Sequence, residues 1–507
     1  MAAFGAVVSL KNTIRFIEES PRLVVSPTSH ILKPAYEAVY GLQDVMKNLE
    51  FTGYTKIRTE VNALDGRITE VIWEFEDLLD SHLYDQILPQ VERVTTVEED
   101  EDEEEEEEDD RSPFFVDLHS LQQSIDQFVA RVTAMAVEYD AELLNMPEEE
   151  AEPISSRIDF SGINSDMVGL NDEFEHVRDY LLAEKEEKCF AITGMAGVGK
   201  TTLAKKVFDD PLIQEHFELR AWVKVGRKCE PNDVLRCILS QLDPNILDQH
   251  DEDQKLVGVL EDRLKDKKCL IMLDDVWEWE TLVWDNLPHK NVRILLTTRF
   301  GIEDYPSQVV RLLNEEESKI LLGDKVFGEK SFPTELEKLG EKIAKKCEGL
   351  PLMIVTIAEL LSEEEKTPEY WIEIAEKQHN SVFVDAYNLI YEVLFPSYDY
   401  LPQYYKMFFL YMGSWPPYFD IGVANFDWRI RAEGFLEPIG NMTLEQFMHI
   451  CSTHLAHWYN LVIFDKNMES WFSERNFRVH SCWQHLCRKE ASNISSFCMF
   501  YRVIMML

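Results

Sequence analysis

The sequence predicts a multidomain protein that starts with an N-terminal α-helical bundle and continues into an α/β domain with a parallel sheet and further helical domains. Residues 1–145 contain few glycines and place apolar residues at helical spacing. After about residue 166, short apolar runs alternate with helical stretches. With 507 residues, the chain is long enough for three or four domains.

Three stretches within residues 1–145 each carry apolar side chains on one helical face. The faces are Val7, Leu10, Ile14 and Ile17; Val71, Ile72, Phe75, Leu78 and Leu79; and Leu118, Leu121, Ile125, Phe128 and Val132. Helices of this kind bury their apolar faces against one another, so we expect a helical bundle. Thirteen consecutive acidic residues, 98–110, interrupt it. Like charges repel, which predicts a solvated, disordered loop, and a partner-binding acidic tract is the alternative.

The net charge of −44 argues against bulk binding to nucleic acid, since an acidic surface repels phosphates. The nine cysteines contain no C-x-x-C pair. They predict the reduced thiols of a cytosolic protein and neither a disulfide framework nor a zinc site. No run of 18 uninterrupted apolar residues occurs, so we expect no permanent membrane span.

Residues 146–166 contain two prolines among acidic and small polar residues, which predicts an interdomain linker. Five apolar runs follow: "CFAITG", "LRAWVKV", "CLIMLDD", "VRILLTT" and "QVVRLL". Continuous apolar strands of this kind are buried on both faces, which indicates a parallel sheet flanked by helices. Residues 314 to about 377 again have a helical pattern, and the region from residue 380 onward mixes helices with short strands.

The stretch "GMAGVGKT" fits the phosphate-loop pattern G-x-x-x-x-G-K-[ST] at Gly194, Gly199, Lys200 and Thr201. A predicted strand precedes it and a predicted helix follows it, as in a P-loop NTPase domain. Gly194, Gly197 and Gly199 would let backbone N–H groups surround phosphate oxygens. Lys200 would reach the β- and γ-phosphates, and the Thr201 hydroxyl would ligate Mg²⁺. Thr202 completes the predicted cofactor-binding set of this loop.

Two further strand ends carry candidate site residues. The run "CLIMLDD" ends in Asp274 and Asp275, at the edge where the strands of a parallel sheet meet a phosphate loop. We expect Asp274 to hold Mg²⁺ and Asp275 to polarise an attacking water as the catalytic residue. The run "VRILLTT" is followed by Arg299, which can sense a γ-phosphate through charge-assisted hydrogen bonds.

Taken together, these motifs resemble the NB-ARC nucleotide-binding module of plant intracellular immune receptors with an N-terminal coiled-coil domain. The resemblance extends to "MVGLNDEFEHV" from Met167, to Gly-Leu-Pro-Leu at 349–352 and to "RAEGFLEP". It includes "FRVHSCWQHLCRKEA", in the place of the Met-His-Asp motif, and "FEDLLDSHL", which resembles the family's acidic signature at Glu76, Asp77 and Asp80.

The resemblance implies a division of the chain into six parts. These are a coiled-coil domain at 1–145, the linker at 146–166, a P-loop nucleotide-binding domain at 167–313, a helical subdomain at 314–385, a winged-helix subdomain at 386–492 and a tail at 493–507. It places Val168 and Pro351 in an adenine pocket and His480 at the β-phosphate of bound ADP. The implied ligands are ADP or ATP with Mg²⁺.

The sequence departs from the family pattern at three places. Ser481 stands where the family has aspartate, so the ADP-bound arrangement is looser here or an acid elsewhere compensates. The chain also ends at Leu507 without the leucine-rich repeats that normally follow, which predicts a truncated receptor. The first helix matches the family's membrane-inserting signature only loosely, and we favour a core-facing bundle helix.

The resemblance implies a nucleotide-dependent switch in plant immunity, ADP-bound when off and ATP-bound when on, with slow hydrolysis as a reset. Its expected partners are other immune receptors or a second copy, contacted through the N-terminal helices. The expected location is cytoplasmic, with membrane association only on activation. The alternative is a truncated regulator or adaptor that binds full-length receptors, and an efficient stand-alone ATPase is the weakest of the three hypotheses.

Overall fold

The computed structural model describes most of the chain. The described residues are 3–27, 30–95, 113–151, 154–157, 167–184, 186–242, 256–278, 291–302, 305–328, 332–363, 367–377, 380–413, 415–432, 434, 436–437, 442–464 and 476–492. The predicted acidic loop at 98–110, most of the second half of the predicted linker and the tail at 493–507 lie outside these residues.

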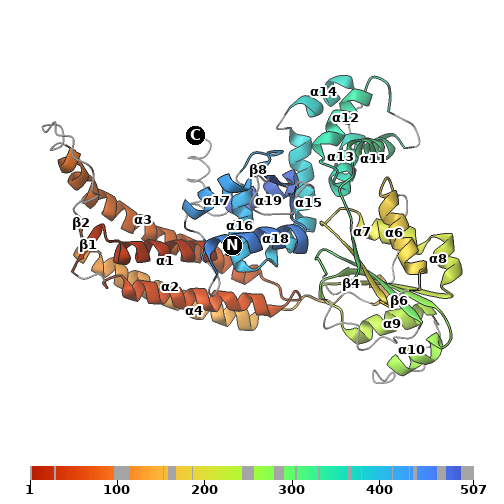
Figure 1. The fold of residues 1–507 in the computed structure, drawn as a ribbon, viewed down its shortest axis with the longest axis horizontal. Helices are drawn as coiled ribbons and strands as arrows, with labels where there is room; N and C mark the ends of the chain where they lie inside the picture. Colours follow the sequence, from red (N-terminus) through yellow and green to blue (C-terminus); the bar gives the residue numbers. More distant parts are fainter. Residues whose placement is uncertain are drawn as a thin grey trace.

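Four long helices form an elongated unit at the N-terminal end of the chain (Figure 1). They are α1 (Ala3–Glu19), α2 (Lys33–Lys47), α3 (Thr59–Thr95) and α4 (Gln122–Asn145). Helix α1 packs on α2 and α3, and α4 packs on the same two helices. The predicted apolar faces are buried, and the rings of Phe75 and Phe128 stack with centroids 3.9 Å apart. Leu78 is the exception at 36% exposed, because Leu79 takes the core position on that turn.

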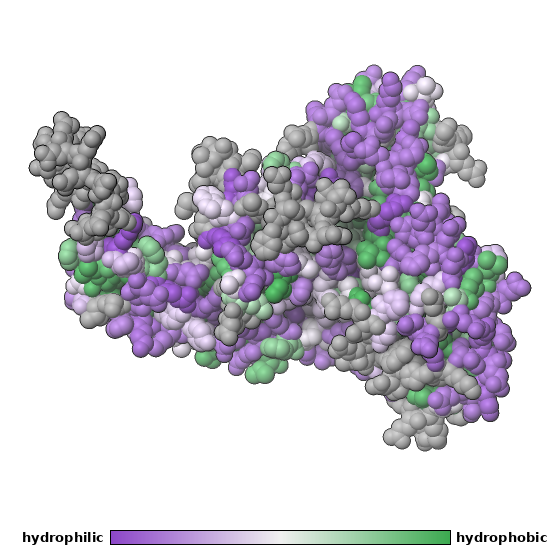
Figure 2. Space-filling view, in the orientation of Figure 1, coloured by the Kyte–Doolittle hydropathy of each residue, from purple (hydrophilic) through white to green (hydrophobic). Residues whose placement is uncertain are grey.

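A two-stranded parallel sheet lies at one end of this unit and was not predicted from the sequence. Strand β1 (Leu23–Ser26) pairs with β2 (Phe114–Asp117). Gln86 and Gln90 of α3 each exchange two hydrogen bonds with the backbone of β2, at Asp117 and Phe115, over 2.7–3.0 Å. These amides satisfy backbone groups of β2 as a further strand would. Figure 2 shows apolar residues gathered at this end, where Phe115 is 65% exposed.

The middle of the chain forms a five-stranded sheet in the order β4-β5-β6-β3-β7, with every neighbouring pair parallel. The predicted parallel sheet is therefore confirmed. The strands are β3 (Cys189–Thr193), β4 (Leu219–Gly226), β5 (Cys269–Val276), β6 (Val292–Thr298) and β7 (Ser307–Val309). The helices of this region are α5 (Ile154–Arg157), α6 (Asn171–Leu182), α7 (Lys200–Phe208), α8 (Pro211–His216), α9 (Pro231–Leu242) and α10 (Leu256–Leu264).

Successive residues of the sheet strands belong to two different cores. Phe190 and Ile192 face the core that includes α6, α7 and α8, whereas Cys189 and Ala191 face the core of α9 and α10. Both faces are buried, because side chains alternate along a strand and helices cover each side. This layering explains the continuous apolar runs of the sequence.

The rest of the chain is mainly helical. Four helices pack together after the sheet: α11 (Glu315–Phe327), α12 (Glu337–Lys346), α13 (Pro351–Glu363) and α14 (Pro368–Glu376). The last region contains α15 (Ser381–Asp399), α16 (Gln403–Met412), α17 (Val423–Ala432), α18 (Leu444–Thr453) and α19 (Ser481–Ser492). It also holds an antiparallel sheet ordered β8-β10-β9, from β8 (Ile421–Gly422), β9 (Val462–Phe464) and β10 (Asn476–Val479).

The N-terminal helices pack against this last region. The buried Lys11 ammonium lies 2.8 Å from a Glu437 carboxylate oxygen and also donates to Gln43. Arg58 donates to the carbonyl of Asp399, and its guanidinium lies 4.2 Å from the ring centroid of Tyr400. Within the described residues, no helix is long and apolar enough to cross a membrane.

Candidate nucleotide-binding site

The predicted phosphate loop, residues 194–199, joins the end of β3 to the start of α7. Gly194, Gly197 and Gly199 have φ angles of 145°, 79° and 99°, which residues with a Cβ rarely adopt. A Cβ on Gly197 would lie 2.6 Å from the Cβ of Leu352, so that position also lacks space for a side chain. The sequence pattern thus reflects both backbone conformation and close packing.

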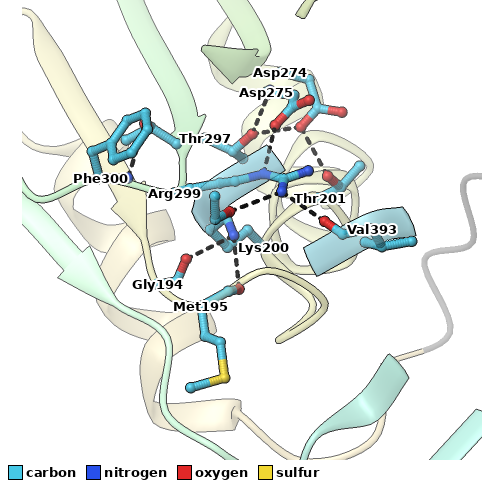
Figure 3. Close-up of polar contacts among 12 residues, drawn as sticks. Gly194, Met195, Lys200, Thr201, Asp274, Asp275, Thr297, Arg299, Phe300 and Val393 are labelled. Carbon is cyan, nitrogen blue, oxygen red and sulfur yellow. Dashed lines mark hydrogen bonds and ion pairs between the residues drawn. The ribbon is translucent and has the colours of Figure 1, made fainter. Parts of the chain in front are cut away.

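Lys200 begins α7 and folds back over the loop. Its ammonium donates to the carbonyls of Gly194 and Met195, at 2.8 and 2.9 Å (Figure 3). The pKa of Lys200 is lowered to about 7, mainly by burial and next by the positive charge of Arg299, while Asp275 and Asp274 act in the opposite direction. A buried ammonium with only carbonyl acceptors suits an incoming anion, since a phosphate would supply the missing negative charge.

Thr201 and Asp274 form the predicted magnesium-binding pair. The Thr201 hydroxyl donates to Asp274 Oδ1 at 2.9 Å, and the Thr297 hydroxyl of β6 donates to the same oxygen at 2.5 Å. Burial is the main cause that raises the pKa of Asp274, while the two hydroxyls oppose it. A hydroxyl and a carboxylate side by side next to a phosphate loop are oxygen ligands of the kind that Mg²⁺ prefers, so these residues fit the predicted ion.

Asp275 and Arg299 form an ion pair with 3.6 Å between Oδ1 and Nε. Arg299 also donates to the carbonyl of Val393 at 2.8 Å and to the Ser397 hydroxyl at 3.0 Å, and both residues belong to α15 (Figure 3). Burial lowers the pKa of Arg299, and the charge of Asp275 opposes that shift. The predicted role of Arg299 in reading a γ-phosphate stays a prediction. In the structure its guanidinium connects the five-stranded sheet to α15.

Pro351, which the resemblance assigns to an adenine pocket, lies beside the phosphate loop. Its Cγ is 4.0 Å from the position of a Cβ on Gly199, and the next amide, Leu352 N–H, donates to the Gly197 carbonyl at 3.1 Å. Gly349 before it has φ 77°, and a Cβ there would lie 2.2 Å from the Leu313 carbonyl oxygen. The Gly-Leu-Pro-Leu motif therefore places the N-terminus of α13 directly against the phosphate loop.

Val168 and Thr202 are half-buried. Thr202 lies in the first turn of α7, and Val168 packs against the main core just before α6. The segment around Val168 is close to α11, since a Cβ on Gly169 would lie 2.5 Å from the Glu317 carboxylate. The segment that the resemblance assigns to the adenine pocket thus touches α11, the first helix after the sheet.

His480 does not lie against the phosphate loop in any contact among the described residues. Its ring is fully buried, with Nε2 at 3.3 Å from the Cys347 carbonyl and Nδ1 at 3.6 Å from Glu348 Oε2. Burial lowers the pKa of His480. The ring contacts the segment that leads into Pro351, so its link to the loop is indirect.

Glu348 was not predicted from the sequence, and it contacts the end of β10 and the start of α19. Its carboxylate accepts the Ser481 N–H at 2.7 Å and lies 3.7 Å from Arg478 Nε. A carboxylate at a helix N-terminus is stabilised by the helix dipole. Glu348 therefore places a carboxylate beside the Ser481 N–H from a different part of the chain. One glutamate in so acidic a sequence gives no signal of this role.

The amino-acid sequence of the chain is similar to those of known proteins. Residues 170–331 match the NB-ARC domain family. The chain is 26% identical over 454 residues to the disease susceptibility protein LOV1 of Arabidopsis thaliana, covering 84% of this chain and 49% of that protein. It is 29% identical to the disease resistance protein RPP13 of the same plant, covering 63% of this chain and 39% of that protein. The chain therefore contains a region that matches the NB-ARC domain and is similar over most of its length to plant disease-resistance and disease-susceptibility proteins.

The chain spans about half the length of LOV1 and less of RPP13. A late blight resistance protein homologue of Solanum demissum is 31% identical over 65% of this chain and 27% of its own length. Among solved structures, the ORC2 protein of Aeropyrum pernix aligns with 67% of this chain and 97% of its own at 13% identity and a TM-score of 0.44, a level from which we conclude nothing.

Proposed function

We propose that this NB-ARC protein is a nucleotide-dependent switch in plant disease resistance, closed with ADP and open with ATP. The phosphate-loop amides, Lys200 and Thr201 would hold the phosphates, with Asp274 and Thr201 holding Mg²⁺. We also propose that α15–α19 with their three-stranded sheet are the winged-helix subdomain and that α1–α4 are the coiled-coil domain. The NB-ARC match over residues 170–331 supports the nucleotide-binding assignment, and the sequence resemblance supports the other two.

The observation that carries the proposal is that three regions meet around one loop. Leu352 of α13 contacts Gly197 inside the loop. Arg299, at the end of β6, joins Asp275 to Val393 and Ser397 of α15. A ligand shifts a conformational equilibrium only through different affinity for the two states. A γ-phosphate that attracts Arg299 would compete with α15 for the same guanidinium, which links nucleotide identity to domain arrangement.

The same geometry favours slow hydrolysis. Asp275, the predicted base, is paired with Arg299 and is held at φ 56°, outside the region usual for aspartate. A carboxylate engaged with a guanidinium is a weak base for water. Opening of the Arg299 contacts would have to precede activation of water by Asp275, so we expect turnover below about 1 per second, the low end for typical enzymes.

Hydrogen exchange of α15 with ADP and with a non-hydrolysable ATP analogue tests the switch. We expect faster exchange in α15 with the ATP analogue, because Val393 and Ser397 lose Arg299. The matched variant Arg299→Gln should show fast exchange with either nucleotide. Equal exchange of α15 in both nucleotide states of the unmodified protein would reject the proposal.

A further inference from the structure

The short turn that leads into α6 has a strained backbone. Gly169 has φ 70°, and Leu170, the residue just before the helix, has φ 56° in the left-handed region. Leucine rarely adopts this region, because its Cβ comes too close to the backbone. Strain of this kind persists only where surrounding contacts hold it, and it is common at ligand sites. The turn directly follows Val168, which the sequence resemblance assigns to an adenine pocket.

The carboxylate of Glu317, in the first turn of α11, packs against this strained turn. A Cβ on Gly169 would lie 2.5 Å from both Cδ and Oε1 of Glu317, so the carboxylate fills the space that a side chain would need. The pKa of Glu317 is lowered, mainly by hydrogen bonding from Arg311, while burial opposes the shift. Hydrogen bonds from the backbone N–H groups of Asn314 and Leu170 lower that pKa further. The carboxylate therefore contacts both residues of the turn.

Arg311 fixes the direction of that carboxylate. Its two terminal nitrogens donate to the two oxygens of Glu317, at 2.7 and 2.9 Å. Its Nε lies 3.1 Å from Oε1 of Glu173, a buried residue of α6. A bidentate pair between a guanidinium and a carboxylate sets orientation as well as distance. Arg311 thus connects α6 to α11 and leaves the Glu317 carboxylate little freedom to turn away.

The backbone on either side of Arg311 is attached to the phosphate-loop site. The Val310 N–H donates to the Thr193 carbonyl at 2.8 Å, where β3 enters the loop. The Leu313 N–H donates to the Gly349 carbonyl at 2.9 Å, in the Gly-Leu-Pro-Leu motif. Residues 310–313 therefore have a fixed position relative to the phosphate loop, and Arg311 relates the turn before α6 to that position.

We propose that Glu317 is a positioning residue for the base of the bound nucleotide, an inference that rests on the nucleotide-binding function proposed above. Oriented by Arg311, its carboxylate holds Gly169 and Leu170 in the left-handed conformation and so keeps Val168 at a set distance from the phosphate loop. Glu317 acts through the turn and does not touch the nucleotide. It contributes to recognition of the base and not to the binding of the phosphates.

Equilibrium binding of ADP and of inorganic pyrophosphate, which has no base, tests the proposal on the full chain freed of nucleotide. We expect Glu317→Ala to weaken ADP binding about tenfold, as for loss of one hydrogen bond to a charged group, and to change pyrophosphate binding less than about twofold. Hydrogen exchange at residues 167–172 should become faster, because the Leu170 N–H loses its acceptor. Glu317→Gln keeps an acceptor oxygen but loses the charge that pairs with Arg311, and its ADP affinity should lie between the two.

Two control variants separate this role from the helix cap that Glu317 also joins. Asn314→Ala removes the acceptor of the Glu317 N–H but keeps the carboxylate, and Glu316→Ala removes an exposed charge from the same turn. Both should keep the ratio of ADP to pyrophosphate affinity of the unmodified protein. An equal loss in Asn314→Ala would assign the effect to the cap and overturn the positioning role.

The binding data also distinguish failure of the positioning role from failure of the proposed function. Unchanged ADP affinity in Glu317→Ala, or an equal loss of ADP and pyrophosphate binding, would overturn the positioning role alone. An unmodified protein that binds neither ligand would overturn the proposed function and the positioning role together.

Discussion

Lys200 is a buried residue with a predicted role in phosphate binding, and its burial changes its charge. Its pKa falls to about 7 mainly because the ammonium is taken out of water, although two carbonyls accept from it. Near neutral pH the nucleotide-free protein then holds a mixture of charged and neutral Lys200. A bound phosphate favours the charged form, so nucleotide binding is coupled to uptake of a proton at pH values above 7.

We therefore predict that nucleotide affinity falls as the pH rises from 7 to 9, by up to about tenfold per pH unit. Calorimetry in buffers of different ionisation enthalpy would measure both the affinity and the proton taken up. Lys200→Arg is the matched control, because a guanidinium stays charged over this range. An equal pH dependence in the two proteins would contradict the assignment to Lys200.

Ser481 and Glu348 show how a structure can change a residue-level expectation. From sequence, an aspartate at 481 should strengthen the ADP-bound form. In the structure the Ser481 N–H already donates to Glu348 at 2.7 Å, so a second carboxylate there would face a like charge. A negative charge does lie beside residue 481, and it belongs to the carboxylate of Glu348.

We predict that Ser481→Asp and Glu348→Gln each reduce the ADP retained after dialysis, with a cost of about 2 kcal/mol for loss of the charged hydrogen bond in Glu348→Gln. The double variant carries a single carboxylate again and should recover most of the loss. A gain of retained ADP in Ser481→Asp alone would show that Glu348 does not compensate.

At the scale of elements, the sequence predicted best those helices and strands whose apolar pattern is continuous. The sheet strands follow the predicted runs, because burial on both faces leaves an unbroken apolar signal. Strands β1 and β2 were missed because each is only four residues long, and β2 is completed by glutamine side chains of α3. Helix α15 runs through the predicted boundary at 385/386, since Asn380 caps its start by accepting the Phe383 N–H.

Helix α1 begins in a tightly packed place against α16. A Cβ on Gly5 would lie 2.1 Å from Met407 Cγ, so the two helices touch without space for a further methyl group. We predicted that this helix faces the core of the bundle. Its residues Ala3, Phe4, Ala6 and Val7 are buried. The helix contacts α16 as well as its neighbours in the N-terminal unit.

We predict that Gly5→Ala lowers the free energy of unfolding by about 1–3 kcal/mol through overpacking, although alanine favours helix by about 1 kcal/mol. Thermal unfolding and hydrogen exchange of α1 would measure the effect. Met407→Ala should remove the clash, so the double variant should show a smaller loss from the alanine at position 5. A stabilised Gly5→Ala protein would mean that α1 is not packed on α16 as described.

At the scale of the whole molecule, the sequence predicted the order of regions and the components of the site but not how the regions meet. Gly194, Lys200, Thr201, Asp274 and Pro351 could be named because each belongs to a local pattern. The contacts that were not predicted join residues about a hundred or more positions apart. They connect Arg299 to α15, Glu348 to Ser481, and Tyr54 to Trp277 and Tyr400. Such contacts depend on tertiary packing, which leaves no periodic trace in a single sequence.

The nucleotide content of the purified protein tests the central claim most directly, since the proposed switch depends on a nucleotide held by the phosphate loop. Extraction and chromatography should recover ADP or ATP from the unmodified chain at close to one per molecule. Lys200→Ala should lose it while Lys206→Ala, on the same helix, should keep it. A protein that carries no nucleotide, or a Lys200→Ala variant that retains the full amount, would contradict the account.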